Sequence, residues 1–188
     1  MVAASGETEG LRPAVAWVLL AGVFVLVTAA ILLSAQTKLY RRVPLETPPE
    51  ELALRARDIL RSTGYSEPPA DTAMGFYQGT DFLRYIAEHD KSKTRWDNLE
   101  TGAFVFWYRG SPRPLAAGNI FSDAPMAGGV WTDDPPLDKY GMTLVSLNPL
   151  GRLTQFVAVP PQVEKAAGPA SPPDWAPLFS AAGLDLSQ

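Results

Sequence analysis

The chain has 188 residues, with no Cys, one His, 16 Lys and Arg and 20 Asp and Glu, which suits one modest domain with an appendage and excludes a large multidomain enzyme. Without cysteine it has no disulfide, thiol nucleophile or zinc-thiolate site. The part after Arg42 holds 12 basic and 18 acidic residues, a net charge of −6. Because phosphate binding depends on clustered Lys and Arg, this composition predicts no nucleic-acid partner.

Residues 14–34 form an uncharged apolar segment of 21 residues. At about 1.5 Å per residue a helix of this length spans roughly 30 Å, the thickness of the hydrocarbon core of a bilayer. The alternatives are a signal peptide and a buried soluble helix. A signal peptide usually has only ~7–15 apolar residues, and no clear A-x-A cleavage site follows here. We therefore expect one transmembrane helix, with the lipid bilayer as its partner.

The charges beside this segment bear on its orientation. Lys38, Arg41 and Arg42 follow it, whereas only Arg12 precedes it. The positive-inside rule would therefore place the C-terminal part in the cytoplasm.

The next segment predicts an amphipathic helix over residues 49–63. Thr47 and Glu50 fit the T-x-x-E pattern of a capping box, and apolar residues then recur at helical spacing. Gly64 is expected to end the helix in a left-handed conformation, which would let Tyr65 fold back on the last turn.

The middle of the chain predicts a short strand over residues 73–78 and a helix over residues 80–88 capped by Thr80. A further turn is expected around Trp96 and Leu99. Residues 103–109 form a continuous aromatic and β-branched run, which predicts a strand covered on both faces.

Residues 110–141 contain ten Gly and Pro residues and are expected to be mostly loop. Residues 142–147 and 152–159 then predict two strands joined by a type I turn over Asn148, Pro149, Leu150 and Gly151.

Together these patterns predict an α+β fold: one N-terminal transmembrane helix followed by a single small domain with a mainly antiparallel sheet. A short helix over residues 174–182 is expected to present Trp175, Leu178, Phe179 and Ala182 on an apolar face that needs a partner. The expected parts are an N-terminal tail (residues 1–13), the transmembrane helix (14–34), a basic juxtamembrane linker (35–46), the α+β domain (47–163), and a Pro- and Ala-rich linker with the short helix (164–188).

The residues predict no catalytic, cofactor-binding or metal-binding group, and no ligand-binding residue is assigned. His89 has no second His or Cys to share a metal, and is expected to interact with a helix C-terminus or with solvent. Asp133 and Asp134 are interpreted as a solvated acidic turn. Arg109 and Arg113 could hold an anion but are more often solvated. A cluster of aromatic residues could line a ligand pocket, although core packing is favoured: Phe76, Tyr77, Trp96, Phe104, Phe106, Trp107 and Tyr108.

Several phrases of the chain, in their order and spacing, resemble one family. They are PPEELALRARDILRSTGY, GFYQGTDFLRYIAEHDKSKTRWDNLETG, FVFWYRGSPRPLAAGN and GMTLVSLNPLGRLTQFVAVPPQ. The stretch from about residue 38 to residue 188 resembles the region that follows the transmembrane helix in large bacterial membrane serine/threonine protein kinases of acidobacterial type. In that family the kinase domain precedes the helix on the cytoplasmic side, which implies that this region lies outside the cytoplasm. This implied orientation is the opposite of the one that the positive-inside rule predicts from the basic residues after the apolar segment.

The sequence departs from the family in two respects: it contains no kinase domain or kinase motif, and it ends where relatives continue. We therefore expect a single-pass protein of the bacterial inner membrane. Its C-terminal domain would be a non-enzymatic, extracytoplasmic sensor or interaction domain that takes a protein or small-molecule ligand. The alternative is a fragment of a larger membrane kinase, or of another membrane enzyme, whose active site lies outside this chain.

Overall fold

The structure is a computed structural model that describes residues 12–37, 39, 43, 45–97, 99–118, 128–162 and 173–186. The chain divides into two compact units, Met1–Arg42 and Val43–Gln188. The described residues confirm the α+β class, with four α-helices and one four-stranded antiparallel sheet. The elements are α1 (Pro13–Thr37), α2 (Pro49–Ser62), β1 (Asp71–Gln78), α3 (Thr80–His89), the short 3-10 helix η2 (Leu99–Thr101), β2 (Phe104–Ser111), β3 (Thr143–Leu147), β4 (Leu153–Ala158) and α4 (Ala176–Ala182).

The first unit contains α1, a continuous helix of 25 residues. Its segment Pro13–Ser34 is long and apolar enough to cross a membrane, and none of its most apolar window is buried in the protein. A core helix of a soluble protein would be mostly buried, because exposed apolar surface costs roughly 25 cal/mol per Å² in water. The basic residues Lys38, Arg41 and Arg42 lie outside the described residues.

The second unit begins with Val43, which is fully buried. The predicted capping box at its first helix was wrong. Pro48 is the N-cap of α2, no side chain caps the helix, and the carbonyl of Pro48 accepts from the N–H groups of Glu51 and Leu52. Pro49 lacks an N–H, so one of the unpaired donors of the first turn is absent in any case.

The C-terminal end of α2 follows the prediction. Gly64 has φ +94°, the Tyr65 N–H donates to the Leu60 carbonyl at 2.8 Å, and the Gly64 N–H donates to the Arg61 carbonyl at 3.1 Å. These are the two hydrogen bonds of a Schellman motif. The turn brings Tyr65 back against the core, where its ring lies 5.9 Å from that of Phe156.

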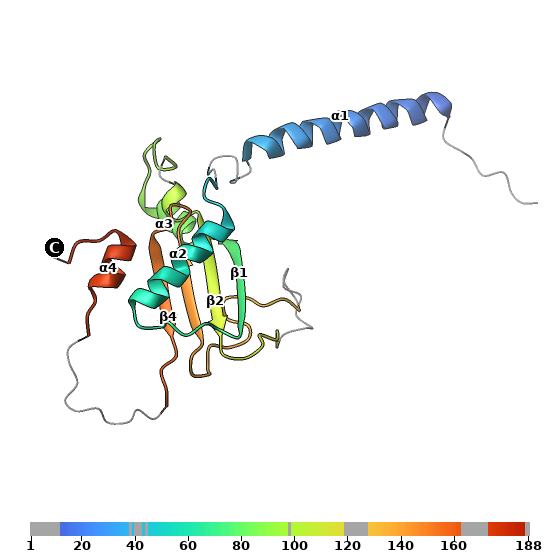
Figure 1. Cartoon of the computed structure of the whole chain (residues 1–188). Helices are drawn as coiled ribbons and strands as arrows, with labels where there is room; N and C mark the ends of the chain where they lie inside the picture. Colours follow the sequence, from blue (N-terminus) through green and yellow to red (C-terminus); the bar gives the residue numbers. More distant parts are fainter. Residues whose placement is uncertain are drawn as a thin grey trace, which may run out of the picture. The chain divides into compact units, whose positions relative to one another are not determined.

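The four strands form an antiparallel meander in the order β1-β2-β3-β4. One face of this sheet is covered by α2, and α4 lies beside α2 against β4 (Figure 1). The short final helix therefore has its partner within the domain, through Leu178 and Ala181. The core between α2 and the sheet consists of Leu52, Ala53, Ala56, Ile59, Leu60, Phe106, Tyr108, Val145 and Leu147.

A β-bulge changes which side chains of β4 face α2. Ser146 pairs with Gln155 but Leu147 pairs with Leu153, so Thr154 is the extra residue on β4. Leu153 and Phe156 therefore both pack against the helical layer, although they are three positions apart in the sequence. Gln155 is left on the opposite face.

The predicted turn between β3 and β4 is present. Gly151 has φ +76° and its N–H donates to the Asn148 carbonyl at 2.9 Å, and the buried Asn148 side chain accepts from the N–H groups of Leu150 and Arg152. A Cβ at Gly151 would lie 2.8 Å from Cδ of Arg55.

Two glycine-to-alanine substitutions separate backbone strain from this contact. Gly64 also has positive φ, but a Cβ there would meet nothing within 4 Å. We expect Gly64→Ala to cost about 1 kcal/mol and Gly151→Ala about 2 kcal/mol in the free energy of unfolding. Urea unfolding of the full chain in detergent measures both. Adding Arg55→Ala to Gly151→Ala should recover the difference; equal costs for the two single substitutions would contradict the contact.

Candidate functional site

The face of the sheet opposite α2 is covered by the connection between β2 and β3. The described parts of this connection, residues 112–118 and 128–142, contain no helix or strand, as the Gly and Pro content predicted, although residues 110 and 111 belong to β2. We call residues 128–142 the covering loop. Tyr77 of β1, Arg109 of β2, Leu144 of β3 and Gln155 of β4 all face this loop.

Arg109 attaches the covering loop to the sheet. Its side chain is fully buried, Nη1 donates to the Trp131 carbonyl at 2.5 Å, and Nη2 donates to the Pro135 carbonyl at 2.7 Å. The expectation of a solvated arginine was therefore wrong for Arg109, whereas Arg113 is exposed. The cause is the alternation of β2, which directs Tyr108 to the core and Arg109 to the loop.

Burial lowers the pKa of Arg109, because desolvation disfavours the charged form, and the carboxylates of Asp133 and Asp134 act in the opposite direction. The two carboxylates therefore stabilise a guanidinium that no longer contacts solvent. Two buried groups on this face, Nε of Arg109 and Nε1 of Trp107, have no hydrogen-bond partner among the described residues.

Further hydrogen bonds give the covering loop its shape. The Trp131 N–H donates to the Asp134 carbonyl at 2.7 Å, and Oδ1 of Asp134 accepts from the Gly118 N–H at 2.8 Å. Leu115 donates its N–H to Oδ2 of Asp71 at the start of β1, at 2.8 Å. The two described parts of the connection are thus joined to each other and to the sheet edge.

Aromatic side chains fill the space beneath the loop. The ring of Trp131 lies 5.7 Å from that of Trp107 in an edge-to-face arrangement and 6.3 Å from that of Tyr77. Trp107 lies over Gly75, where a Cβ would be 3.0 Å from its Nε1. A glycine at this register position of β1 therefore leaves room for the indole.

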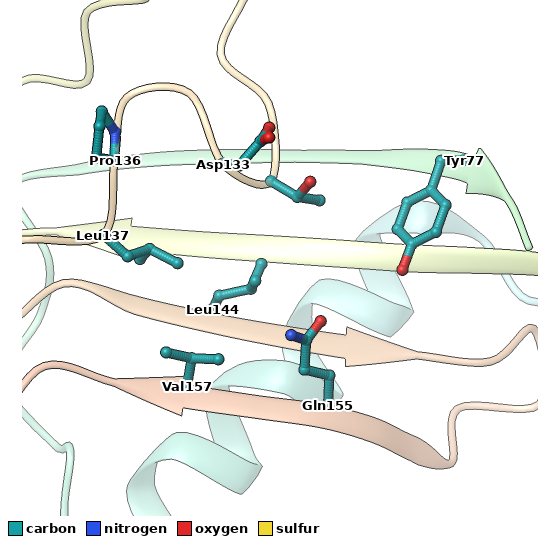
Figure 2. Close-up of a pocket in the computed structure, with 8 residues that line it drawn as sticks. Tyr77, Asp133, Pro136, Leu137, Leu144, Gln155 and Val157 are labelled. Carbon is teal, nitrogen blue, oxygen red and sulfur yellow. The ribbon is translucent and has the colours of Figure 1, made fainter. Parts of the chain in front are cut away.

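A groove remains between the covering loop and the sheet, with a volume of about 430 Å³. The loop contributes one wall, and the strands contribute the floor (Figure 2). In Figure 2 Leu137, Leu144 and Val157 gather toward one end, and Tyr77 lies at the other with its hydroxyl directed at the sheet. The lining residues are Tyr77, Thr132, Asp133, Pro136, Leu137, Leu144, Gln155 and Val157.

The polar groups of the groove have defined states. Burial raises the pKa of Tyr77, and the charge of Asp81 raises it further, whereas a hydrogen bond with Ser146 opposes both effects. The Tyr77 hydroxyl is therefore protonated at neutral pH and can both donate and accept. The Ser146 hydroxyl also donates to Oε1 of Gln155 at 3.3 Å, which orients that amide group.

The other sequence candidates divide between the core and the surface. Phe76, Phe106 and Tyr108 belong to the core, as favoured, and Tyr77 is the aromatic candidate that lines the groove. His89 is exposed at the end of α3, where Nδ1 lies 2.9 Å from the Tyr85 carbonyl and the two rings stack at 4.2 Å. Among the described residues no group of three or more His, Cys, Asp and Glu side chains could hold a metal ion.

Asp133 and Asp134 differ in their surroundings, so the expected solvated acidic turn is found at Asp133 and not at Asp134. Asp133 is exposed at the groove, whereas Asp134 is half-buried and accepts from Gly118. Sequence reasoning had not assigned Pro136, Leu137 or Gln155 to a site. The sequence signal that pointed to this region was the high density of Gly and Pro in residues 110–141, directly after a strand that was expected to be covered on both faces.

Comparisons of the chain with protein-family models, with curated proteins and with solved structures found no match. The candidate site is therefore defined by its geometry alone.

We expect Arg109→Met to lower the free energy of unfolding by roughly 2–4 kcal/mol, because two carbonyls that accept from a cation lose their donors in a buried position. Arg113→Met removes the same charge from an exposed position and should change the free energy by less than about 0.5 kcal/mol. Urea unfolding of the full chain in detergent, followed by tryptophan fluorescence, compares the two variants. Equal losses would show that Arg109 does not hold the loop.

Proposed function

We propose that this chain is a single-pass protein of the bacterial inner membrane whose C-terminal domain is a non-catalytic sensor that binds a small molecule in the groove. The observation that carries the proposal is the groove itself, because a concave site with an apolar part and a few converging polar groups is the usual form of a ligand site. Its volume of about 430 Å³ lies within the range of small-molecule pockets.

Binding fits the lining better than catalysis does. A catalytic site needs a nucleophile or general base held by a partner at hydrogen-bond distance, with a pKa near the working pH. The groove offers Tyr77, whose pKa is raised further from neutrality, and the exposed carboxylate of Asp133. These groups can recognise a ligand without reacting with it.

Anchoring by α1 is supported by its length and its apolar, exposed surface. For the orientation we follow the family resemblance, which places the domain outside the cytoplasm, over the basic residues that follow the helix. Long domains are translocated largely regardless of nearby charge, so the charge rule is weak support here.

The resemblance also favours a second candidate, a fragment of a larger membrane serine/threonine kinase or of another membrane enzyme. In that case the groove would regulate an active site on another part of the protein. A kinase reading frame directly upstream of this one would favour the fragment, and an isolated frame with its own promoter would favour the tethered sensor.

Reporter fusions after Gln188 test the anchor and the orientation. In bacterial cells we expect alkaline phosphatase to be active and green fluorescent protein to be dark at this position. The double substitution Val23→Arg and Leu26→Arg should reduce the phosphatase activity, since each charge costs about 2.5–3.5 kcal/mol at the centre of a membrane helix. The matched control, Leu184→Arg with Leu186→Arg, changes two exposed leucines outside α1. A fluorescent C-terminal fusion would contradict the orientation.

Blocking the groove tests the binding site. Gln155 is exposed and lines the groove, and Thr154 beside it is exposed and does not line the groove. In a fragment screen by ¹⁹F NMR on the full chain in nanodiscs, we expect binding fragments to be lost in Gln155→Trp and retained in Thr154→Trp. If fragments bind the wild type and both variants alike, the groove is not the binding site.

A further inference from the structure

The charges that surround the groove are unequal in sign. Asp81, near Tyr77, pairs with Arg84, and Asp138 pairs with Lys139 at 2.9 Å, so these four residues cancel locally. The carboxylates of Asp133 and Asp134 both interact with the buried guanidinium of Arg109. Of these three residues Asp133 alone lines the groove, so the charge that the lining presents is negative.

The guanidinium of Arg109 is not available to an anionic ligand. Arg109 is fully buried beneath the covering loop, and both of its terminal nitrogens donate to loop carbonyls. It is also absent from the residues that line the groove. A carboxylate or phosphate in the groove would meet the exposed carboxylate of Asp133, whereas the Arg109 guanidinium is buried and already donates to the loop, so like-charge repulsion would disfavour such a ligand.

The polar lining groups include several acceptors. The carboxylate of Asp133 and the hydroxyl oxygens of Thr132 and Tyr77 can each accept a hydrogen bond, and so can the amide oxygen of Gln155. An ammonium group supplies three donors and a positive charge. The side chains of Leu137, Leu144 and Val157 form an apolar surface toward one end of the same groove (Figure 2).

We infer that the groove selects a small amphiphilic amine, with its ammonium group at Asp133 and its apolar body against Leu137, Leu144 and Val157. This inference rests on the proposed function and adds to it the chemical class of the ligand. The selectivity comes from the exposed carboxylate of Asp133, which is the one charged side chain among the residues that line the groove, whereas the apolar surface contributes affinity that does not depend on charge.

Three probes with one skeleton test the inference: 2-phenylethylamine, 2-phenylethanol and phenylacetate. The full chain carries 5-fluorotryptophan and is held in phosphatidylcholine nanodiscs, and each probe is titrated while the ¹⁹F resonance of Trp131 is followed. Trp131 reports on the groove because its ring lies 6.3 Å from that of Tyr77. Titration of empty nanodiscs corrects the free concentration of each probe.

We expect the amine to bind at least about tenfold more tightly than phenylacetate, with the alcohol between them. Asp133→Asn should reduce this ratio to less than about threefold. The matched control Asp138→Asn removes a charge from the same loop, outside the lining, and should leave the ratio unchanged. If Asp133→Asn does not fold, the salt dependence of binding to the wild type serves as the test instead. Raising the salt concentration from about 20 mM to about 500 mM should weaken the binding of the amine and leave the binding of the alcohol unchanged.

The possible failures are distinguishable. If phenylacetate binds as tightly as the amine, or if Asp133→Asn keeps the full ratio, the inferred amine class is wrong while the groove remains a binding site. If none of the three probes shifts the Trp131 resonance, both the amine class and the proposed binding site fail.

Discussion

The groove depends on one buried cation. Arg109 extends from the second strand and donates to two backbone carbonyls of the covering loop, at 2.5 and 2.7 Å. A loop without secondary structure has few ways to satisfy its carbonyls away from water, and a fixed planar guanidinium satisfies two of them at once. Asp133 and Asp134 offset the desolvation of the guanidinium. The loop is thereby held over a sheet face that would otherwise expose Trp107 and Leu144, and the groove is the space that remains.

The regular elements could be predicted from the sequence because local patterns determine them. The helical spacing before Gly64, the aromatic run of β2 and the Asn148–Gly151 turn each correspond to an observed element. Most of the predicted ends lie within one or two residues of the observed ends. The capping box failed because Pro48 and Pro49 already begin α2 without a side-chain cap. The class of the fold followed from the order of these elements, and the structure shows the same class.

The candidate site was much harder to predict, because its residues come together only through long-range pairing. The sequence places Arg109 at the end of a predicted strand and Arg113 in the loop after it, but only the register of β2 against its neighbours directs the Arg109 side chain under the loop. The bulge at Thr154 likewise depends on long-range pairing. It turns Gln155 toward the groove, and it follows from the pairing of β3 with β4 and not from the composition of the strand. The aromatic residues were identified as a group, but the strand alternation that divides them between two faces needed the structure.

The two layers of the domain share the same strands. Leu144 lines the groove and Val145, its neighbour on β3, is fully buried against α2. Protein interiors are close-packed and compress little, so a strand cannot shift on one side without displacing what it touches on the other. A molecule that widens the groove would therefore shift the strands and, through them, displace α2, which is the first helix after the apolar segment in chain order. The sheet would in this way transmit a displacement from a ligand on one face to the helix on the other face.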